Sequence, residues 1–169
     1  MDFVFLFKPI DGRRVKIHII ALGHKMPAWI NVGVAEYTKR MPPEARCEWI
    51  ELKPEQRASR DSGRVLALEA QKIEAAMPKH ALRIVCDERG KTLTTPLLAQ
   101  WMGEWMAEGV SPCFIIGSAD GLSPEIKAGA AHRVALSGCV LPHGLVRVIL
   151  AEQLYRAWSM RHNHPYHRE

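Results

Sequence analysis

Residues 113–126 read CFIIGSADGLSPEI, and this stretch decides the fold. The four apolar residues from Cys113 to Ile116 predict a short buried strand that ends at Gly117. Ser123 and Pro124 are typical of a helix start, with serine as the N-cap and proline at the first helical position. The order of strand, glycine-bearing loop and helix is that of an α/β unit.

The same alternation extends along the chain in both directions. Upstream, we expect strands at 16–22, 47–52 and 82–86, helices at 27–40, 62–77 and from Pro96 onward, and a polar turn at 87–90. Downstream, we expect a strand at 133–136, a helix at 145–160 and a polar tail at 161–169. This pattern predicts an α/β fold in which helices flank both faces of a mostly parallel sheet, within one domain.

Charge and cysteine content indicate the environment. The chain has 23 Lys and Arg against 18 Asp and Glu, and its net charge of +5 suits an anionic partner such as RNA without identifying one. The four cysteines form no C-x-x-C pair, which favours a reduced, cytoplasmic protein. The apolar run at 3–7 is too short for a secretory signal, and no stretch approaches the roughly 20 apolar residues that cross a membrane.

Ligands of such sheets bind at the loops that follow the strands. The loop at 117–121, GSADG, has two glycines that permit close approach, although a plain strand-to-helix turn has a similar sequence. Residues 137–144, SGCVLPHG, form an apolar stretch bracketed by glycine and proline. Its backbone N–H and C=O groups need partners, which packing or the edge of an adenine could supply.

The tail carries His162, His164 and His167 without a nearby cysteine, so we expect no metal. Together with Tyr166 and Arg168, these histidines suit contacts with phosphates and bases. The alternative is a disordered tail.

Several segments together resemble one known family. IIGSADGLSP at 115–124, LPHGLVRVILAEQLYRAWS at 141–159 and NHPYHRE at 163–169 are similar to the RlmH (YbeA) family of SPOUT methyltransferases. KIHIIALGHKMPAW at 16–29 is similar to the amino terminus of that family, so the resemblance covers Lys16 to Glu169. It implies a SPOUT methyltransferase fold with a C-terminal trefoil knot, and a homodimer in which each site is built against the partner subunit.

The resemblance also implies a cofactor, S-adenosylmethionine, and its contacts. These contacts fall on Cys86, Gly117 and Ser118 and on the segment made of Ser137, Gly138, Cys139, Val140, Leu141 and Pro142. The family usually has leucine in place of Cys86 and glycine in place of Ser118. Serine would be strained if the backbone there needed a positive φ, so Ser118 bears on cofactor affinity.

The implied reaction is methylation of N3 of a pseudouridine in 23S rRNA within the ribosome. Methyl transfer from a sulfonium needs in-line positioning and the loss of one proton, and requires no metal. A cation would stabilise the charge that develops on the base. The candidate residues are His143 and Arg156, with Tyr166, His167 and Arg168 closing over the base. Two structural alternatives remain: Arg156 could pair with Glu152, and His143 could cap the helix that follows.

Two other functions stay open at this stage, a SPOUT methyltransferase acting on tRNA and a non-catalytic ribosome-binding protein of the same fold. Residues 1–15 are expected to be an extension before a single SPOUT domain at 16–169, because the family starts about one residue before Lys16. Val15 occupies the place of the initiator methionine, and a GUG start codon reads internally as valine. We therefore interpret residues 1–14 as the product of an upstream start assignment, and a true extension is the alternative.

Overall fold

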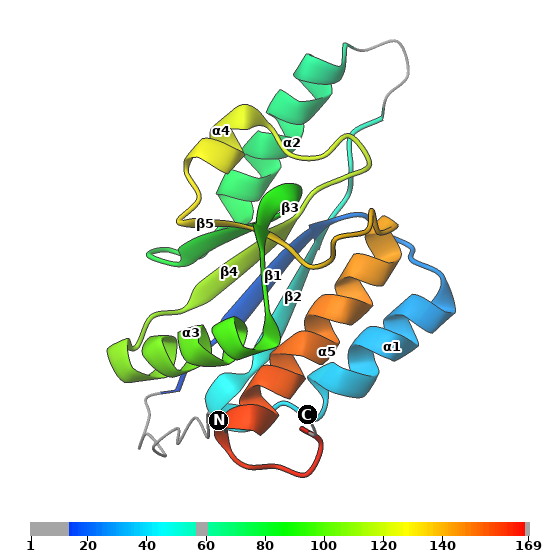
Figure 1. The fold of residues 1–169 in the computed structure, drawn as a ribbon. Coiled ribbons are helices and arrows are strands. Elements are labelled where there is room, and N and C mark those ends of the chain that lie inside the picture. The colour runs from blue at the N-terminus through cyan, green and yellow to red at the C-terminus, as the bar shows by residue number, and fades with distance from the viewer. Residues whose placement is uncertain (1–13, 57–60, 168–169) are drawn as a thin grey trace.

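The computed structural model describes residues 14–56 and 61–167, which form a five-stranded sheet (Figure 1). The strand order is β2-β1-β4-β3-β5, and every neighbouring pair is parallel. The strands are β1 (Ile17–Leu22), β2 (Cys47–Leu52), β3 (Leu82–Thr92), β4 (Pro112–Ile116) and β5 (His132–Ala135). The prediction of an α/β fold with a parallel sheet is confirmed.

The helices are α1 (Ala28–Thr38), α2 (Ser62–Ala76), α3 (Thr95–Glu108), α4 (Pro124–Ala128) and α5 (His143–Arg161), and a 3-10 turn spans Pro43–Ala45. They begin and end within about two residues of the predicted bounds. The predicted start of α4 is confirmed, because the Ser123 side chain accepts the N–H of Ile126 at 3.2 Å and Pro124 follows it.

Strand β1 packs into two separate cores. All six of its residues are buried, and successive side chains of a strand point to opposite faces of the sheet. Ile17 and Ile19 pack with α3 and α5, whereas Ile20 and Leu22 pack with α2 and α4. Figure 1 shows α1, α3 and α5 on one face and α2 and α4 on the other. A continuous apolar run is what a parallel strand covered on both faces requires.

The predicted polar turn at 87–90 is wrong, because β3 continues through it to Thr92. Cys86 and Lys91 both pair with Val134 of β5, so the residues between them bulge out of the ladder. A Cβ at Gly90 would lie 2.6 Å from the backbone nitrogen of Val134, so only glycine fits this close approach. The bulge places a charged segment beside the ends of β4 and β5.

Some expectations remain predictions. The trefoil knot is one of them, and residues 1–13 of the expected extension at 1–15, together with Arg168 and Glu169, lie outside the described residues. Val15 is 2% exposed and its N–H donates to the carbonyl of Glu44 at 2.8 Å. Within the part of the chain that the structure describes, no helix has the length and apolar character to span a bilayer.

Candidate active site

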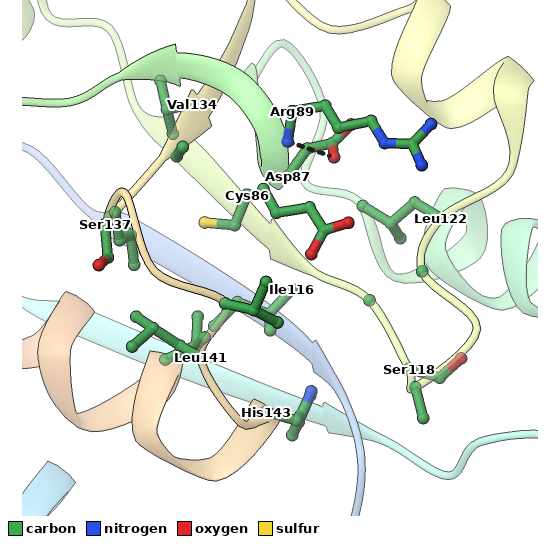
Figure 2. Close-up of a pocket in the computed structure, with 18 of the residues that line it drawn as sticks. Cys86, Asp87, Arg89, Ile116, Ser118, Leu122, Val134, Ser137, Leu141 and His143 are labelled. Atoms are coloured by element: carbon green, nitrogen blue, oxygen red, sulfur yellow. Dashed lines mark hydrogen bonds between the residues drawn. The ribbon is translucent and has the colours of Figure 1, made fainter.

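A cavity of about 490 Å³ lies at the carboxyl ends of β4 and β5, beside the bulge of β3. Its walls are the β3 bulge, the loop at 117–122, and residues 134–141 with the first turn of α5. Figure 2 shows Cys86, Ile116, Leu141 and His143 around this space. The volume falls within the range of about 300 to 1,000 Å³ that is common for small-molecule and cofactor sites. The position is the one expected for ligands of a parallel α/β sheet.

The structure brings most of the predicted cofactor residues together along this cavity. Those that line it are Cys86, Gly117, Ser118, Ser137, Cys139, Val140 and Leu141. Gly138 and Pro142 belong to the same segment but do not line the cavity. The contact of each of these residues with a cofactor stays a prediction.

Sequence reasoning missed the charged wall of the cavity, which Asp87, Glu88, Arg89 and Lys127 form. The Asp87 carboxylate lies 2.7 Å from Arg133 Nη2 and 3.2 Å from Lys127 Nζ. Burial raises the pKa of Asp87, but hydrogen bonds from Arg133, the Arg89 backbone and Lys127 outweigh it, so the net shift is downward. A run of charged residues directly after a buried strand was the signal that could have revealed this wall.

Ser118 fits its loop without strain. Its φ is not positive, so the condition under which serine would be strained is not met. The Ser118 hydroxyl donates to Glu69 Oε2 at 2.8 Å, and the other oxygen of this 2% exposed carboxylate accepts the N–H of Glu55 at 3.0 Å. Gly117 is required by space, since a Cβ there would lie 2.5 Å from the carbonyl oxygen of Gly121.

His143 begins α5 and lines the cavity. It does not cap the helix, because the N-cap position is Pro142 and no side-chain hydrogen bond caps this end. His143 Nε2 accepts a hydrogen bond from Arg147 Nε at 3.1 Å, and the ring also bonds to the backbone of Gly117. Burial, and then the charge of Arg147, lower the pKa of His143. The imidazole is therefore neutral at pH 7, and its role as a charged catalytic group stays untested.

A second cluster lies near the carboxyl end of α5. Arg156 pairs with Glu152 Oε1 at 2.6 Å, so the pairing considered from the sequence is present. The Tyr166 hydroxyl donates to the same oxygen at 2.9 Å, and the Arg156 guanidinium lies 4.9 Å from the centroid of the Tyr166 ring. His167 is close in sequence, and within the described residues its buried Nδ1 has no hydrogen-bond partner. The tail is therefore folded against α5 as far as His167.

The two clusters stand at opposite ends of one helix. Arg156 is thirteen residues beyond His143 on α5, which at a rise of about 1.5 Å per residue separates them by about 20 Å. Figure 1 shows α5 running from the segment after β5 toward the carboxyl-terminal tail. The predicted catalytic residues thus do not converge within one chain: His143 lies at the cavity, and Arg156 and Tyr166 lie at the other end.

The tail histidines do not assemble a ligand set for a metal. Across residues 14–56 and 61–167, no group of three or more His, Cys, Asp or Glu is placed to hold a metal ion. His162 stacks on Trp158 with ring centroids 4.6 Å apart, and His164 lies 5.8 Å from the same ring. The absence of a metal requirement remains a prediction.

Comparison with known proteins agrees with this geometry. A family model described as predicted SPOUT methyltransferase matches residues 15–167. The chain belongs to the SPOUT methyltransferase family. It is 57% identical to ribosomal RNA large subunit methyltransferase H of Ralstonia pickettii (strain 12J) over 155 residues, which cover 91% of this chain and 99% of that protein. Proteins of the same name from Burkholderia thailandensis and Burkholderia vietnamiensis are 55% and 56% identical with the same coverage.

SPOUT methyltransferases use S-adenosylmethionine, and the cavity fits this cofactor chemically. Ile116, Leu136 and Leu141 give the cavity an apolar side on which an adenine can pack. Asp87, Glu88 and Asp120 line the same cavity together with Arg89 and Lys127, so carboxylates that suit a sulfonium and an ammonium group lie in the same cavity as cations that suit a carboxylate. The SPOUT assignment and the lining of the cavity therefore agree.

Proposed function

We propose that this chain methylates N3 of a pseudouridine in 23S rRNA of the bacterial large ribosomal subunit, in the cytoplasm and as a homodimer. The observation that carries the proposal is the extent of the match. Relatives named ribosomal RNA large subunit methyltransferase H are 55–57% identical over 91% of the chain. This match spans the cofactor cavity, α5 and the tail together, so the parts that would select the RNA are included with those that hold the cofactor.

The cofactor side of the site positions the reacting methyl. When bound, S-adenosylmethionine supplies a methyl group on a positively charged sulfur, so the protein supplies position rather than a nucleophile. Cys86 and Leu141 would pack on the adenosine, and the backbone of residues 137–142 would pair with the adenine edge. The 117–121 loop, where glycine allows close approach, would hold the remainder.

The substrate side would be formed by Arg156 and Tyr166. Loss of the N3 proton puts negative charge on the base, and a fixed cation stabilises that charge. The hydrogen bond with Glu152 raises the pKa of Arg156, so this cation stays protonated. Tyr166, which His167 and Arg168 follow in the sequence, would offer a ring on which a base can stack.

The separation of about 20 Å along α5 implies that a subunit cannot use its own tail at its own cavity. A symmetric dimer resolves this, because each tail can then reach the cavity of the partner. Trp29 and Val32 on α1 are 60% and 68% exposed, and α1 packs beside α5. An exposed apolar face of this kind supports an interface next to the helix that carries the tail.

The direct test is methyl transfer to ribosomes that lack this modification, followed with tritiated S-adenosylmethionine and located by mass spectrometry. We expect the label on a single pseudouridine of 23S rRNA. Transfer to tRNA instead would overturn the substrate assignment. Cofactor binding without transfer to any RNA would favour a non-catalytic ribosome-binding protein.

Mixed dimers test the shared site. One chain lacks residues 163–169, and the other carries Cys139→Arg, which puts bulk and positive charge into the cavity at an exposed position. Each variant alone should be nearly inactive, and the mixture should recover part of the activity because one intact cavity meets one intact tail. Failure of the mixture, when both variants are folded and exchange subunits, would contradict a site shared between subunits.

A further inference from the structure

Arg147 on α5 is a buried cation that the proposed reaction does not use. Its side chain is 2% exposed, and each of its three nitrogens makes a hydrogen bond. Nη1 bonds Glu51 Oε1 at 2.6 Å, Nη2 bonds the carbonyl of Gly23 at 2.7 Å, and Nε bonds His143 Nε2 at 3.1 Å. Burying a charge is costly unless its donors are satisfied, so the position of this side chain is closely specified.

The partners of Arg147 come from separate parts of the fold. Gly23 follows β1, Glu51 lies near the end of β2, and His143 begins α5. Gly23 has a φ of +151°, and a Cβ there would lie 2.8 Å from Arg147 Nη2 and 2.9 Å from His143 Nε2. Any side chain at this position would displace both groups, so glycine is required here.

The two bonds of His143 define its proton arrangement. Because Nε2 accepts from Arg147, the proton of the neutral ring lies on Nδ1 and is donated to the carbonyl of Gly117. Both ring nitrogens are thus used inside the protein. A second proton would break the bond to Arg147 and bring two cations together, and among the described residues the ion-pair partner of Arg147 is Glu51, which is 46% exposed.

Gly117 opens the loop that lines the cavity, and the loop is fixed from a second direction by the bond from Ser118 to Glu69. Figure 2 shows His143 and Ser118 on the helix and the loop that border this part of the cavity. The chain of contacts from Glu51 through Arg147 and His143 therefore ends on the backbone of the cofactor loop. Of these three residues, His143 lines the cavity, whereas Arg147 and Glu51 do not.

We propose that Arg147 is a positioning residue for the cofactor loop, acting through a neutral His143 that holds the carbonyl of Gly117. His143 is then a connector between helix and loop, rather than the cation or the proton acceptor of the reaction. The proposal rests on the proposed function in that the cavity binds S-adenosylmethionine.

The test measures cofactor affinity by calorimetry on the full-length chain. Arg147→Met removes the charge and all three bonds, and we expect it to weaken S-adenosylmethionine binding by more than tenfold. Arg64→Met is the matched control, because this arginine is exposed on α2 and does not line the cavity, and binding should be unchanged. Arg147→Lys keeps the charge without the three-bond geometry, and should fall between them.

A pair of substitutions at His143 covers the case in which Arg147→Met fails to fold. An asparagine amide can occupy the place of Nδ1 and donate to the Gly117 carbonyl, whereas alanine cannot. We expect His143→Asn to bind the cofactor within a few-fold of wild type and His143→Ala to bind more than tenfold more weakly. Equal affinities for His143→Ala and wild type would overturn the proposal.

Nitrogen-15 NMR of the His143 ring measures its tautomer and its pKa, which a general packing role of Arg147 would not determine. In the wild type we expect the neutral Nδ1–H form at pH 7 even without cofactor, and a higher pKa for His143 in Arg147→Met. A charged ring or the Nε2–H form at pH 7 would overturn the proposal independently of cofactor binding. If the wild type shows the Nδ1–H form but binds no S-adenosylmethionine, the proposed function fails and the hydrogen-bonded connection stands.

Discussion

Thiol labelling can show whether the 137–142 segment holds the cofactor. The chain has four cysteines, of which Cys139 is exposed and lines the cavity. Burial raises the pKa of Cys47, Cys86 and Cys113 to about 12. At pH 8 a thiol with that pKa is ionised to about one part in ten thousand, and only the thiolate reacts quickly. We therefore expect iodoacetamide to label the native protein once, at Cys139, and the denatured protein four times.

Bound cofactor should protect Cys139, because the cavity that this residue lines would then be filled. Protection follows the fraction of free protein, so a cofactor concentration about 100 times the Kd leaves about 1% free and slows labelling by up to about a hundredfold. The assay is intact-protein mass spectrometry over time, with and without S-adenosylmethionine. Cys139→Ser is the control and should take no label while folded. Labelling of Cys139 at an unchanged rate under saturating cofactor would refute the placement of this segment against the ligand.

Three further measurements test other parts of the structure. Tyr166→Phe removes a hydrogen bond to the Glu152 carboxylate, and this bond is worth about 1.5–3 kcal/mol. The rate of methyl transfer should therefore fall at least about tenfold, while calorimetry shows nearly unchanged cofactor affinity. Gly103→Ala would force a Cβ into the Arg161 guanidinium and should cost about 1–3 kcal/mol in urea unfolding; an unchanged midpoint would contradict this packing. The pKa of His143 is lowered in the folded protein, so the stability that comes from its neutral ring is present above pH 6.5 and is lost as the pH falls toward the folded-state pKa; urea unfolding between pH 8 and 5 should show this loss in the wild type and not in His143→Asn.

The parallel sheet could be predicted because its signals are local. The apolar run of β1 reflects burial on both faces, and the serine and proline before α4 are sufficient to start that helix. The bulge at 87–90 could not be predicted in the same way. It depends on two residues of β3 pairing with Val134, more than forty residues later in the chain, whereas the charged sequence itself is typical of a turn.

The candidate site was predictable where it follows from topology. The carboxyl ends of parallel strands meet at one edge, so Cys86, Gly117 and Ser137 were expected to lie close together, and all three line the cavity. Arg147 was missed because a basic residue on a helix is usually exposed. Its partners Gly23 and Glu51 are distant in sequence, and only the spacing of four residues from His143 hinted at the contact.

Helix α5 carries Arg147, which is buried, and Arg156, which is partly exposed, and this difference in exposure determines the role that each can have. Arg147 is 2% exposed and its three nitrogens are bonded to the protein, so it can position its neighbours but cannot meet a substrate. Arg156 keeps 30% of its side chain exposed and shares one carboxylate with Tyr166, so its charge remains accessible to RNA. Arg156 lies nine residues beyond Arg147, which places these functions about 14 Å apart along the helix axis. In the proposed function this helix fixes the cofactor loop at its amino end and presents the RNA-contacting group at its carboxyl end, and a second subunit would bring the two together.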